Sequence, residues 1–236
     1  MLDGAVAASL LGWWLDAGVD VPVAEAPRDW LRQNPAAEPA PAAPIALTPA
    51  AATGRAALDS LDDYQAWLRE GLDLPLFQAG AGRALPHGPA QAPLMIVADL
   101  PEREGSSEGR PITGEAWALT ERMLAAIGFT PEQVYVAALA CFPAPAGRLD
   151  PRLAVECGAE IRRHIALAAP QRLLLLGEGP AKALTGQGLV QARGRIHRID
   201  HIPAVVTFHP RQLLSHPPHK AHAWRDLLLL MSEEIS

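Results

Sequence analysis

Residues 206–214 read VTFHPRQLL and place a histidine directly after an apolar run. The run Ile202 to Phe208 has the length and composition of a buried strand. Pro210 ends this strand because proline has no backbone N–H to donate to a ladder. His209 is therefore predicted to lie at a strand end. In an open α/β sheet the carboxyl ends of the strands are where ligands bind, so His209 is also a candidate site residue.

Short apolar runs alternate with helical patterns along the preceding part of the chain. The predicted strands are 94–98, 134–139, 172–176 and 202–208, and the predicted helices are 115–127, 151–168, 179–184 and 219–231. Strands that alternate with helices imply right-handed crossovers and a parallel sheet that is covered on both faces. We therefore expect an α/β fold with three layers, α-β-α.

The 236 residues, 49% of them apolar, are enough for one globular domain with appendages. Apolar side chains at helical spacing over 5–15 predict an N-terminal helix, so residues 1–33 are interpreted as a helical appendage. Residues 34–54 are mostly Ala and Pro and form a predicted linker, since this composition cannot bury a core. The remaining residues, 55–236, form the predicted domain.

The composition limits the cellular setting. Two cysteines cannot build a disulfide framework and are typical of a reducing cytoplasm. No apolar run approaches the length of a membrane span, and no basic residue precedes the apolar segment 6–15, which argues against a secretory signal. We expect a cytoplasmic monomer without membrane association.

The net charge of −6 argues against nucleic-acid binding by the whole surface, but the charge is unevenly distributed. Between Val190 and Arg225 the only acidic residue is Asp200. The basic residues of this segment are Arg193, Arg195, Arg198, Arg211, Lys220 and Arg225, and its histidines are His197, His201, His209, His216, His219 and His222. These side chains are either solvated loop residues or part of a surface that faces phosphates.

The pattern Thr-aromatic-His-Pro-x-x-Leu-Leu, followed by KAHAWRDL at 220–227, resembles the C-terminal motif of the uracil-DNA glycosylase superfamily. The resemblance is strongest to its iron-sulfur (fourth) family. Segments that match in the same order are 10–20, which is similar to the N-terminal helix of alphaproteobacterial members, 123–128, 134–136, 173–177, 181–184 and 193–194. The resemblance implies a four-stranded, mostly parallel sheet between helices, DNA as the partner, and excision of uracil or another deaminated base.

The resemblance also implies roles for individual residues. Asp99 matches the family's loop glutamate and would orient the attacking water, while His209 would lie near the base oxygen that gathers charge. Pro101 matches the proline of the same loop and would line the base. Arg211 and Lys220 are candidate phosphate contacts, although both could equally be solvated surface charges.

Several positions depart from the family pattern. Glu102 replaces a loop glycine, and Gly105 and Ser106 replace an acidic pair. Ile112 stands where the family has a stacking phenylalanine, a change that would lose about 1 to 3 kcal/mol of base stacking. Ala138 stands where an asparagine amide binds the uracil edge, and alanine can neither donate nor accept. The pocket is therefore expected to be less selective for uracil.

The ligands of the family's iron-sulfur cluster are incomplete. The family uses four cysteines, whereas this chain has Cys141 and Cys157, which share the spacing of the second pair. The gap-free register puts Phe142 at the first of these two positions. We therefore expect no iron-sulfur cluster and two buried free thiols.

A metal site at His216, His219 and His222 is a further possibility from their spacing. It is not expected, because metal-binding motifs normally add an i,i+4 pair or a carboxylate partner, and Pro217 and Pro218 interrupt the helix before His219.

Two hypotheses about function remain open. The first is a divergent glycosylase in which Asp99 positions a water and His209 stabilises the departing base. The second is a module of the same fold that binds DNA or protein after its site decayed, which the combined departures favour. An enzyme would lose product formation when Asp99 or His209 is replaced by alanine, whereas a binding module would be indifferent to both changes.

Overall fold

The computed structural model describes residues 58–102, 108–144 and 150–232. These residues belong to one compact unit, 54–236. The N-terminal helix predicted at 5–15 and the Ala/Pro-rich linker lie outside the described residues. No helix of the described part is long and apolar enough to cross a membrane.

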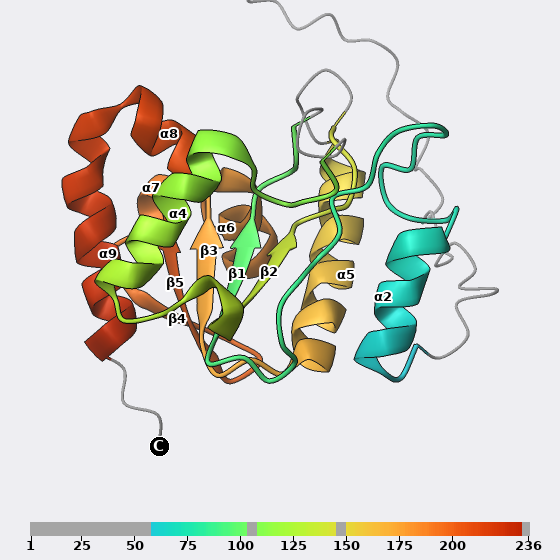
Figure 1. The fold of residues 1–236 in the computed structure, drawn as a ribbon, viewed down its shortest axis with the longest axis horizontal. Helices are drawn as coiled ribbons and strands as arrows, with labels where there is room; N and C mark the ends of the chain where they lie inside the picture. The colour runs from blue at the N-terminus through green and yellow to red at the C-terminus, as the bar shows by residue number, and fades with distance from the viewer. Residues whose placement is uncertain (1–57, 103–107, 145–149, 233–236) are drawn as a thin grey trace, which may run out of the picture. The chain divides into compact units, whose positions relative to one another are not determined.

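A single sheet lies at the centre of the domain (Figure 1). Its strands are β1 (Leu94–Ala98), β2 (Val134–Ala138), β3 (Leu173–Leu176), β4 (Ile196–Ile199) and β5 (Ile202–Thr207), in the order β2-β1-β3-β5-β4. The first three and β5 are parallel, and β4 pairs antiparallel with β5. The predicted α/β fold and its four parallel strands are confirmed. The sheet has one strand more than predicted, the edge strand β4.

The edge strand β4 escaped prediction because its sequence carries little of a strand pattern. Within the strand, His197 and Arg198 are polar, and only Ile199 is fully buried. A two-residue turn, Asp200 and His201, joins it to β5 with φ values of 47° and 74°. Positive φ at both central residues is typical of tight hairpins, but Asn-Gly or Asp-Gly is the usual sequence signal for it.

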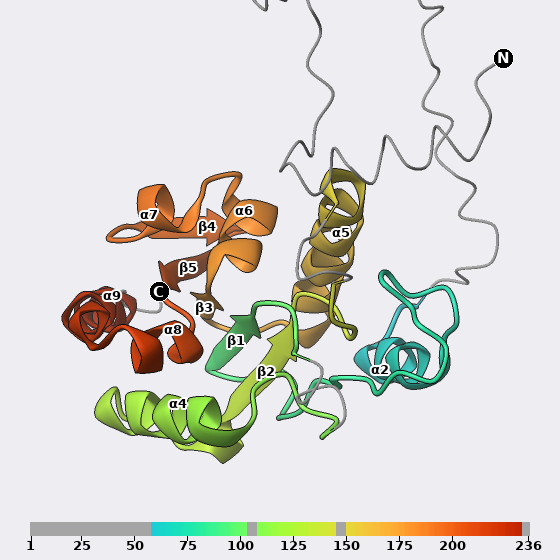
Figure 2. The same cartoon turned by 90° about the horizontal axis from the view of Figure 1, so that it is seen from above.

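Helices cover both faces of the sheet, as seen from above in Figure 2. One face carries α4 (Gly114–Ala126) and α9 (Lys220–Ser232), and the other carries α5 (Pro151–Ala168), α6 (Glu178–Thr185) and α7 (Leu189–Ala192). Helix α2 (Leu61–Glu70) packs outside α5, and the short α8 (Pro210–Ser215) follows β5 directly. Two 3-10 turns, η1 (Pro131–Gln133) and η3 (Pro217–His219), complete the described elements.

The central strands are buried on both sides, which explains their continuous apolar sequences. In β1, Leu94 and Ile96 pack toward α4 and α9, whereas Met95 and Val97 pack toward α5. All five residues of β1 are completely buried. Such strands show no alternation of polar and apolar residues, and this is why length rather than periodicity predicted them.

A segment that approaches closely covers the free edge of β2. The N–H and C=O groups of His87 and Val136 pair at 3.0 and 2.8 Å. The next residue, Gly88, has φ +117°, and a Cβ atom there would lie 2.7 Å from the Cα atom of Tyr135. Only glycine combines this backbone conformation with this approach.

We predict that Gly88→Ala lowers the free energy of unfolding by about 2 kcal/mol or more, because strain at positive φ adds to overpacking. Gly80→Ala is the matched control. Gly80 has φ +79°, but no atom lies within 4 Å of the position that a Cβ atom would take there, so Gly80→Ala should lower the free energy of unfolding by only about 1 kcal/mol. Urea unfolding of the full chain measures both values, and equal losses would contradict the packing argument.

Candidate active site

The carboxyl ends of the parallel strands lie along one edge of the sheet. The register pairs Ala98 of β1 with Ala138 of β2 and Leu176 of β3, and Leu176 with Thr207 of β5. The chain leaves β1 for β2 on one side, and β3 lies on the other side of β1. This change of direction creates a crevice at the carboxyl ends of β1 and β3, where open α/β sheets bind ligands.

Asp99 follows β1 and lies in this crevice, against the N-terminus of α6. Its Oδ1 accepts a hydrogen bond from the backbone N–H of Leu100 at 2.8 Å, and its Oδ2 accepts one from Gly179 at 3.3 Å. A Cβ atom on Gly177 would lie 2.8 Å from the Asp99 Oδ2, and one on Gly179 would lie closer still to Oδ1. The two glycines therefore leave the space that the carboxylate fills.

Asp99 lines a groove of about 960 Å³ between α5 and α6. The groove is largely apolar, with Gly158 and Ala159 on the α5 side. Arg162 and Lys182 supply positive charge, and Glu178, which pairs with Lys182 at 2.9 Å, supplies negative charge.

His209 is the N-cap residue of α8. Its Nδ1 accepts hydrogen bonds from the backbone N–H and the Nε of Arg211, at 3.2 and 3.3 Å. Because Nδ1 accepts, the proton of the neutral ring is assigned to Nε2. Burial, together with the charge of Arg211, lowers the pKa of His209 to about 3, so the ring is neutral at physiological pH.

The Nε2 of His209 is buried and has no hydrogen-bond partner among the described residues. It belongs to a ring that lines a cavity of about 430 Å³ between the start of α4 and α8. Ile112 and Pro111 contribute an apolar wall, and Glu108 and Glu115 contribute carboxylate oxygens. The cavity thus has acidic residues and an apolar wall, and it lies beside a buried ring whose Nε2 has no partner among the described residues.

Arg211 connects the loop after β1 with the turn at His209. Besides its bonds to His209, its Nη2 donates to the carbonyl of Leu100 at 3.4 Å, and its guanidinium pairs with Glu102. Both Arg211 and Glu102 line the His209 cavity. The charge of Glu102, which stands at the position of the loop glycine in the resembled family, is therefore balanced by the guanidinium of Arg211.

The structure brings together only some of the predicted site residues. Ile112 and Arg211 share the cavity of His209, but Asp99 lines the separate groove. The other predicted residues lie elsewhere: Pro101 is buried and lines neither cavity, Ala138 lines the small cavity near Cys141, and Lys220 is exposed at the start of α9. The assigned roles of all these residues stay predictions.

Sequence reasoning missed a buried network beside the site. The Asp226 carboxylate, 1% exposed, accepts hydrogen bonds from Thr207 Oγ1 at 2.7 Å and from Arg193 Nε at 2.8 Å. Arg193 Nη2 lies 2.7 Å from the same oxygen, and the backbone N–H of Gly194 donates to the other oxygen at 3.3 Å. The sequence placed Asp226 only within a motif match, and it listed Arg193 among residues that are solvated or face phosphates, whereas the structure pairs Arg193 with a buried aspartate. An aspartate inside an apolar helix is the signal that a buried partner exists.

The guanidinium of Arg193 also lies over the ring of Phe208, 4.1 Å from its centroid. Thr207 and Phe208, the two residues before His209, are thus both held by the network. Arg193 and Asp226 therefore fix the backbone that presents the histidine.

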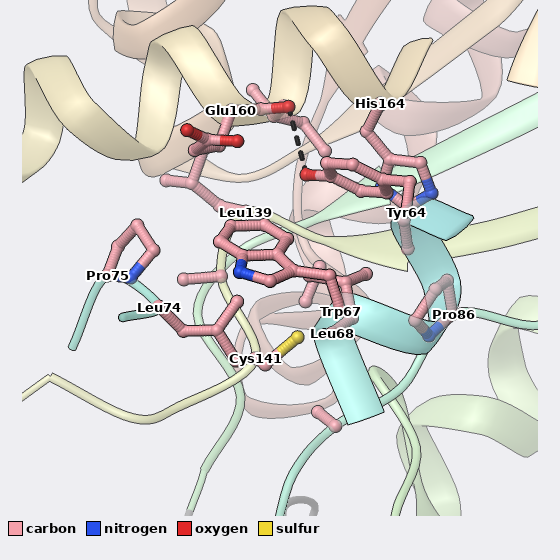
Figure 3. A pocket seen from close by; sticks show the side chains of 15 residues that line it. Tyr64, Trp67, Leu68, Leu74, Pro75, Pro86, Leu139, Cys141, Glu160 and His164 are labelled. Carbon is pink, nitrogen blue, oxygen red and sulfur yellow. Dashed lines mark hydrogen bonds between the residues drawn. The ribbon is translucent and has the colours of Figure 1, made fainter. Parts of the chain in front are cut away.

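The residues around the two cysteines do not fit an iron-sulfur cluster. Cys141 lines a cavity of only about 30 Å³, room for about two waters. Figure 3 shows this cavity enclosed by Tyr64 and Trp67 among other side chains, with the Tyr64 hydroxyl directed at the Glu160 carbonyl. Burial raises the pKa of the Cys141 thiol to about 12 and that of Cys157 to about 11, whereas cluster ligands are thiolates.

The described residues contain no group of three or more His, Cys, Asp or Glu side chains that could hold a metal ion. The imidazole of His219, one of the three regularly spaced histidines, stacks on Phe208 with 4.4 Å between ring centroids.

The fold and the site together define the class of protein: a three-layer α/β domain with a histidine at the carboxyl edge of its sheet. The family model of the uracil DNA glycosylase superfamily matches residues 85–228, more than half of the chain. The chain therefore belongs to the uracil-DNA glycosylase superfamily. It is similar to a type-4 uracil-DNA glycosylase from Archaeoglobus fulgidus, with 24% identity over 141 residues that cover 55% of this chain and 71% of the relative. The resemblance inferred from the sequence is confirmed at the level of the superfamily.

The low pKa of His209 predicts an acid-dependent loss of stability. In the unfolded chain His209 binds a proton below the ordinary histidine pKa of about 6.5, whereas in the folded chain it binds one only near pH 3. The free energy of unfolding therefore falls as the pH falls between these two values. His209 alone should contribute a loss of about 2 kcal/mol between pH 7 and pH 5. In His209→Asn this part should disappear. Urea unfolding at the two pH values tests it, and an unchanged pH-dependent loss would contradict the burial of a neutral ring.

We predict that Asp226→Ala lowers the free energy of unfolding by about 3 to 5 kcal/mol, because the charge of Arg193 and the hydroxyl of Thr207 lose their buried partner. Lys182→Ala is the control. It breaks the exposed pair with Glu178 and should cost less than about 1 kcal/mol. If thermal or urea unfolding showed similar losses for the two variants, the network would not be the anchor described above.

Proposed function

We propose that this chain is a divergent DNA N-glycosylase that excises uracil or another deaminated base from DNA. The observation that carries the proposal is the neutral imidazole of His209, whose Nε2–H is buried and has no partner among the described residues of the cavity. Such a donor suits a reaction in which negative charge appears on an oxygen of the departing base.

The chemistry requires a nucleotide that is turned out of the base stack, because the glycosidic bond is inaccessible inside a duplex. With the base in the cavity, His209 would donate a hydrogen bond from Nε2 to the base oxygen as the bond breaks, and the base would leave with the electron pair of that bond, as an anion. Its Nδ1 is occupied by Arg211, which keeps the donor tautomer in place. A water would then attack the sugar carbon that the base has left, oriented by the Asp99 carboxylate, and the proton that this water loses would end on the base anion.

The lining of the cavity supports a broader choice of base than uracil alone. Ile112 offers an aliphatic face, which every base can contact, and the carboxylates of Glu108 and Glu115 can accept from ring N–H groups. Uracil, hypoxanthine and xanthine all present such a donor beside a carbonyl oxygen. We therefore propose deaminated pyrimidines and purines as the substrate class.

The proposal includes DNA as the partner and excludes a resident cluster. Arg211 and Lys220 would contact phosphates, helped by a segment without acidic residues from His201 to Arg225. The two protonated, buried thiols of Cys141 and Cys157 would leave the protein without an iron-sulfur centre.

Two observations favour the alternative, a module that binds DNA without cleaving it. Asp99 and His209 line separate cavities, and no amide stands at Ala138 to bind the edge of the base. In this case the fold would keep DNA affinity but form no product.

Incubation with oligonucleotides that contain uracil, hypoxanthine or xanthine, followed by alkaline cleavage of abasic sites, tests the proposal. We expect product from at least one of them, and at least about 100-fold less from His209→Ala, the usual effect of removing such a donor. His201→Asn is the control, because His201 precedes β5 and thus lies at the opposite edge of the sheet, and asparagine tolerates its positive φ. No product from the folded wild-type protein would favour the binding module, and full activity in His209→Ala would refute the role of His209.

A further inference from the structure

Aromatic rings and a guanidinium form a stacked column beside the proposed site. The Phe208 ring has the Arg193 guanidinium 4.1 Å from its centroid, and the His219 ring lies parallel to it at 4.4 Å and 8°. Both groups cannot occupy one face of the ring, so Phe208 is enclosed between them. His216 continues the column beyond His219, with 5.6 Å between ring centroids and 16° between planes.

The inner part of the column is rigid. Arg193 is fixed by the buried Asp226, and Phe208 follows Thr207, which is bound to the same carboxylate. The backbone N–H of His219 donates to the carbonyl of His216 at 3.0 Å, which closes the η3 turn between the two stacked histidines. A ring held in this way loses little conformational entropy when a further ring stacks on it.

The outer end of the column is open to solvent. His216 is exposed, and its Nδ1 lies 2.9 Å from Ser215 Oγ, which orients the ring through its edge rather than its face. His216 is also the C-cap residue of α8, the helix that His209 caps at its other end. Six residues of helix span about 9 Å, so the exposed ring lies close to the His209 cavity, which Leu214 and Ser215 also line.

We propose that His216 is a stacking platform for an unpaired nucleobase next to the nucleotide that enters the His209 cavity. A base has a π-face whatever its sequence, and stacking on an aromatic side chain is a sequence-tolerant source of affinity for single strands. The surrounding residues from His209 to Arg225 include Arg211, Lys220 and Arg225 but no acidic residue, so phosphates are not repelled by this segment. The platform rests on the DNA binding of the proposed function but not on its chemistry.

The test uses the full chain and a single-stranded oligonucleotide that carries 2-aminopurine next to a uracil, with affinity from anisotropy and stacking from fluorescence quenching. His216→Ala should raise the dissociation constant about five- to tenfold, near the low end for loss of a stacking partner, and should relieve the quenching. His216→Phe should restore both. His222→Ala is the matched control, because His222 is exposed on α9, has no ring contact in the described structure and should leave the quenching unchanged.

His216→Lys separates stacking from charge, since lysine can contact phosphate but has no ring. Affinity and quenching that survive in His216→Lys, or that are unaffected in His216→Ala, would overturn the platform. Abasic-site formation is scored on the same oligonucleotide. If His216→Ala relieves the quenching but the wild type forms no product, the result supports the platform and counts against excision. If the wild type forms product but His216→Ala changes neither affinity nor quenching, the result supports excision and counts against the platform.

Discussion

The site depends on the hydrogen bonds and the ion pair that the buried carboxylate of Asp226 makes. This carboxylate joins three parts of the chain that are distant in sequence: the end of β5 through Thr207, the segment before β4 through Arg193, and α9, on which it lies. A buried aspartate is costly unless it is paired and fully hydrogen-bonded, and here both oxygens accept. This network fixes the direction of the backbone after β5, and the position of His209 follows from that direction.

His209 in turn owes its chemical state to its neighbours. Burial disfavours the imidazolium and lowers the pKa of the ring, and the Arg211 guanidinium beside Nδ1 opposes a second positive charge. The same arginine reaches the Leu100 carbonyl and Glu102, so the loop after β1 and the turn after β5 are linked by one side chain. The arginine that helps to keep His209 neutral is therefore the same one that joins the two loops beside the site.

The sequence predicted the parts of this structure that depend on burial. Runs such as Leu94 to Ala98 are buried on both faces, so their composition alone gave the parallel strands, and Pro210 gave the strand end at His209. It could not predict which cavity each residue would line. Asp99 follows β1 and His209 comes after β5, with β3 between these strands in the sheet, and Gly177 and Gly179 draw the Asp99 carboxylate to the side of α6. Contacts of this kind join residues about 80 positions apart and leave no local pattern.

The Nε2–H of His209, which has no partner among the residues that the structure describes, bears on the choice between an enzyme and a binding module. A buried donor without a partner costs about 1 to 3 kcal/mol, and an apolar residue in its place would avoid that cost. In a protein that only binds the DNA backbone, nothing would offset it, because phosphate contacts come from exposed cations. In a glycosylase the cost is recovered when the donor meets charge on a base, and the rigid support from Arg211, Thr207 and Asp226 is then the preorganisation that such a donor requires. The state of this one nitrogen supports the proposed catalysis over the binding module, although the groups expected to recognise the base edge are replaced.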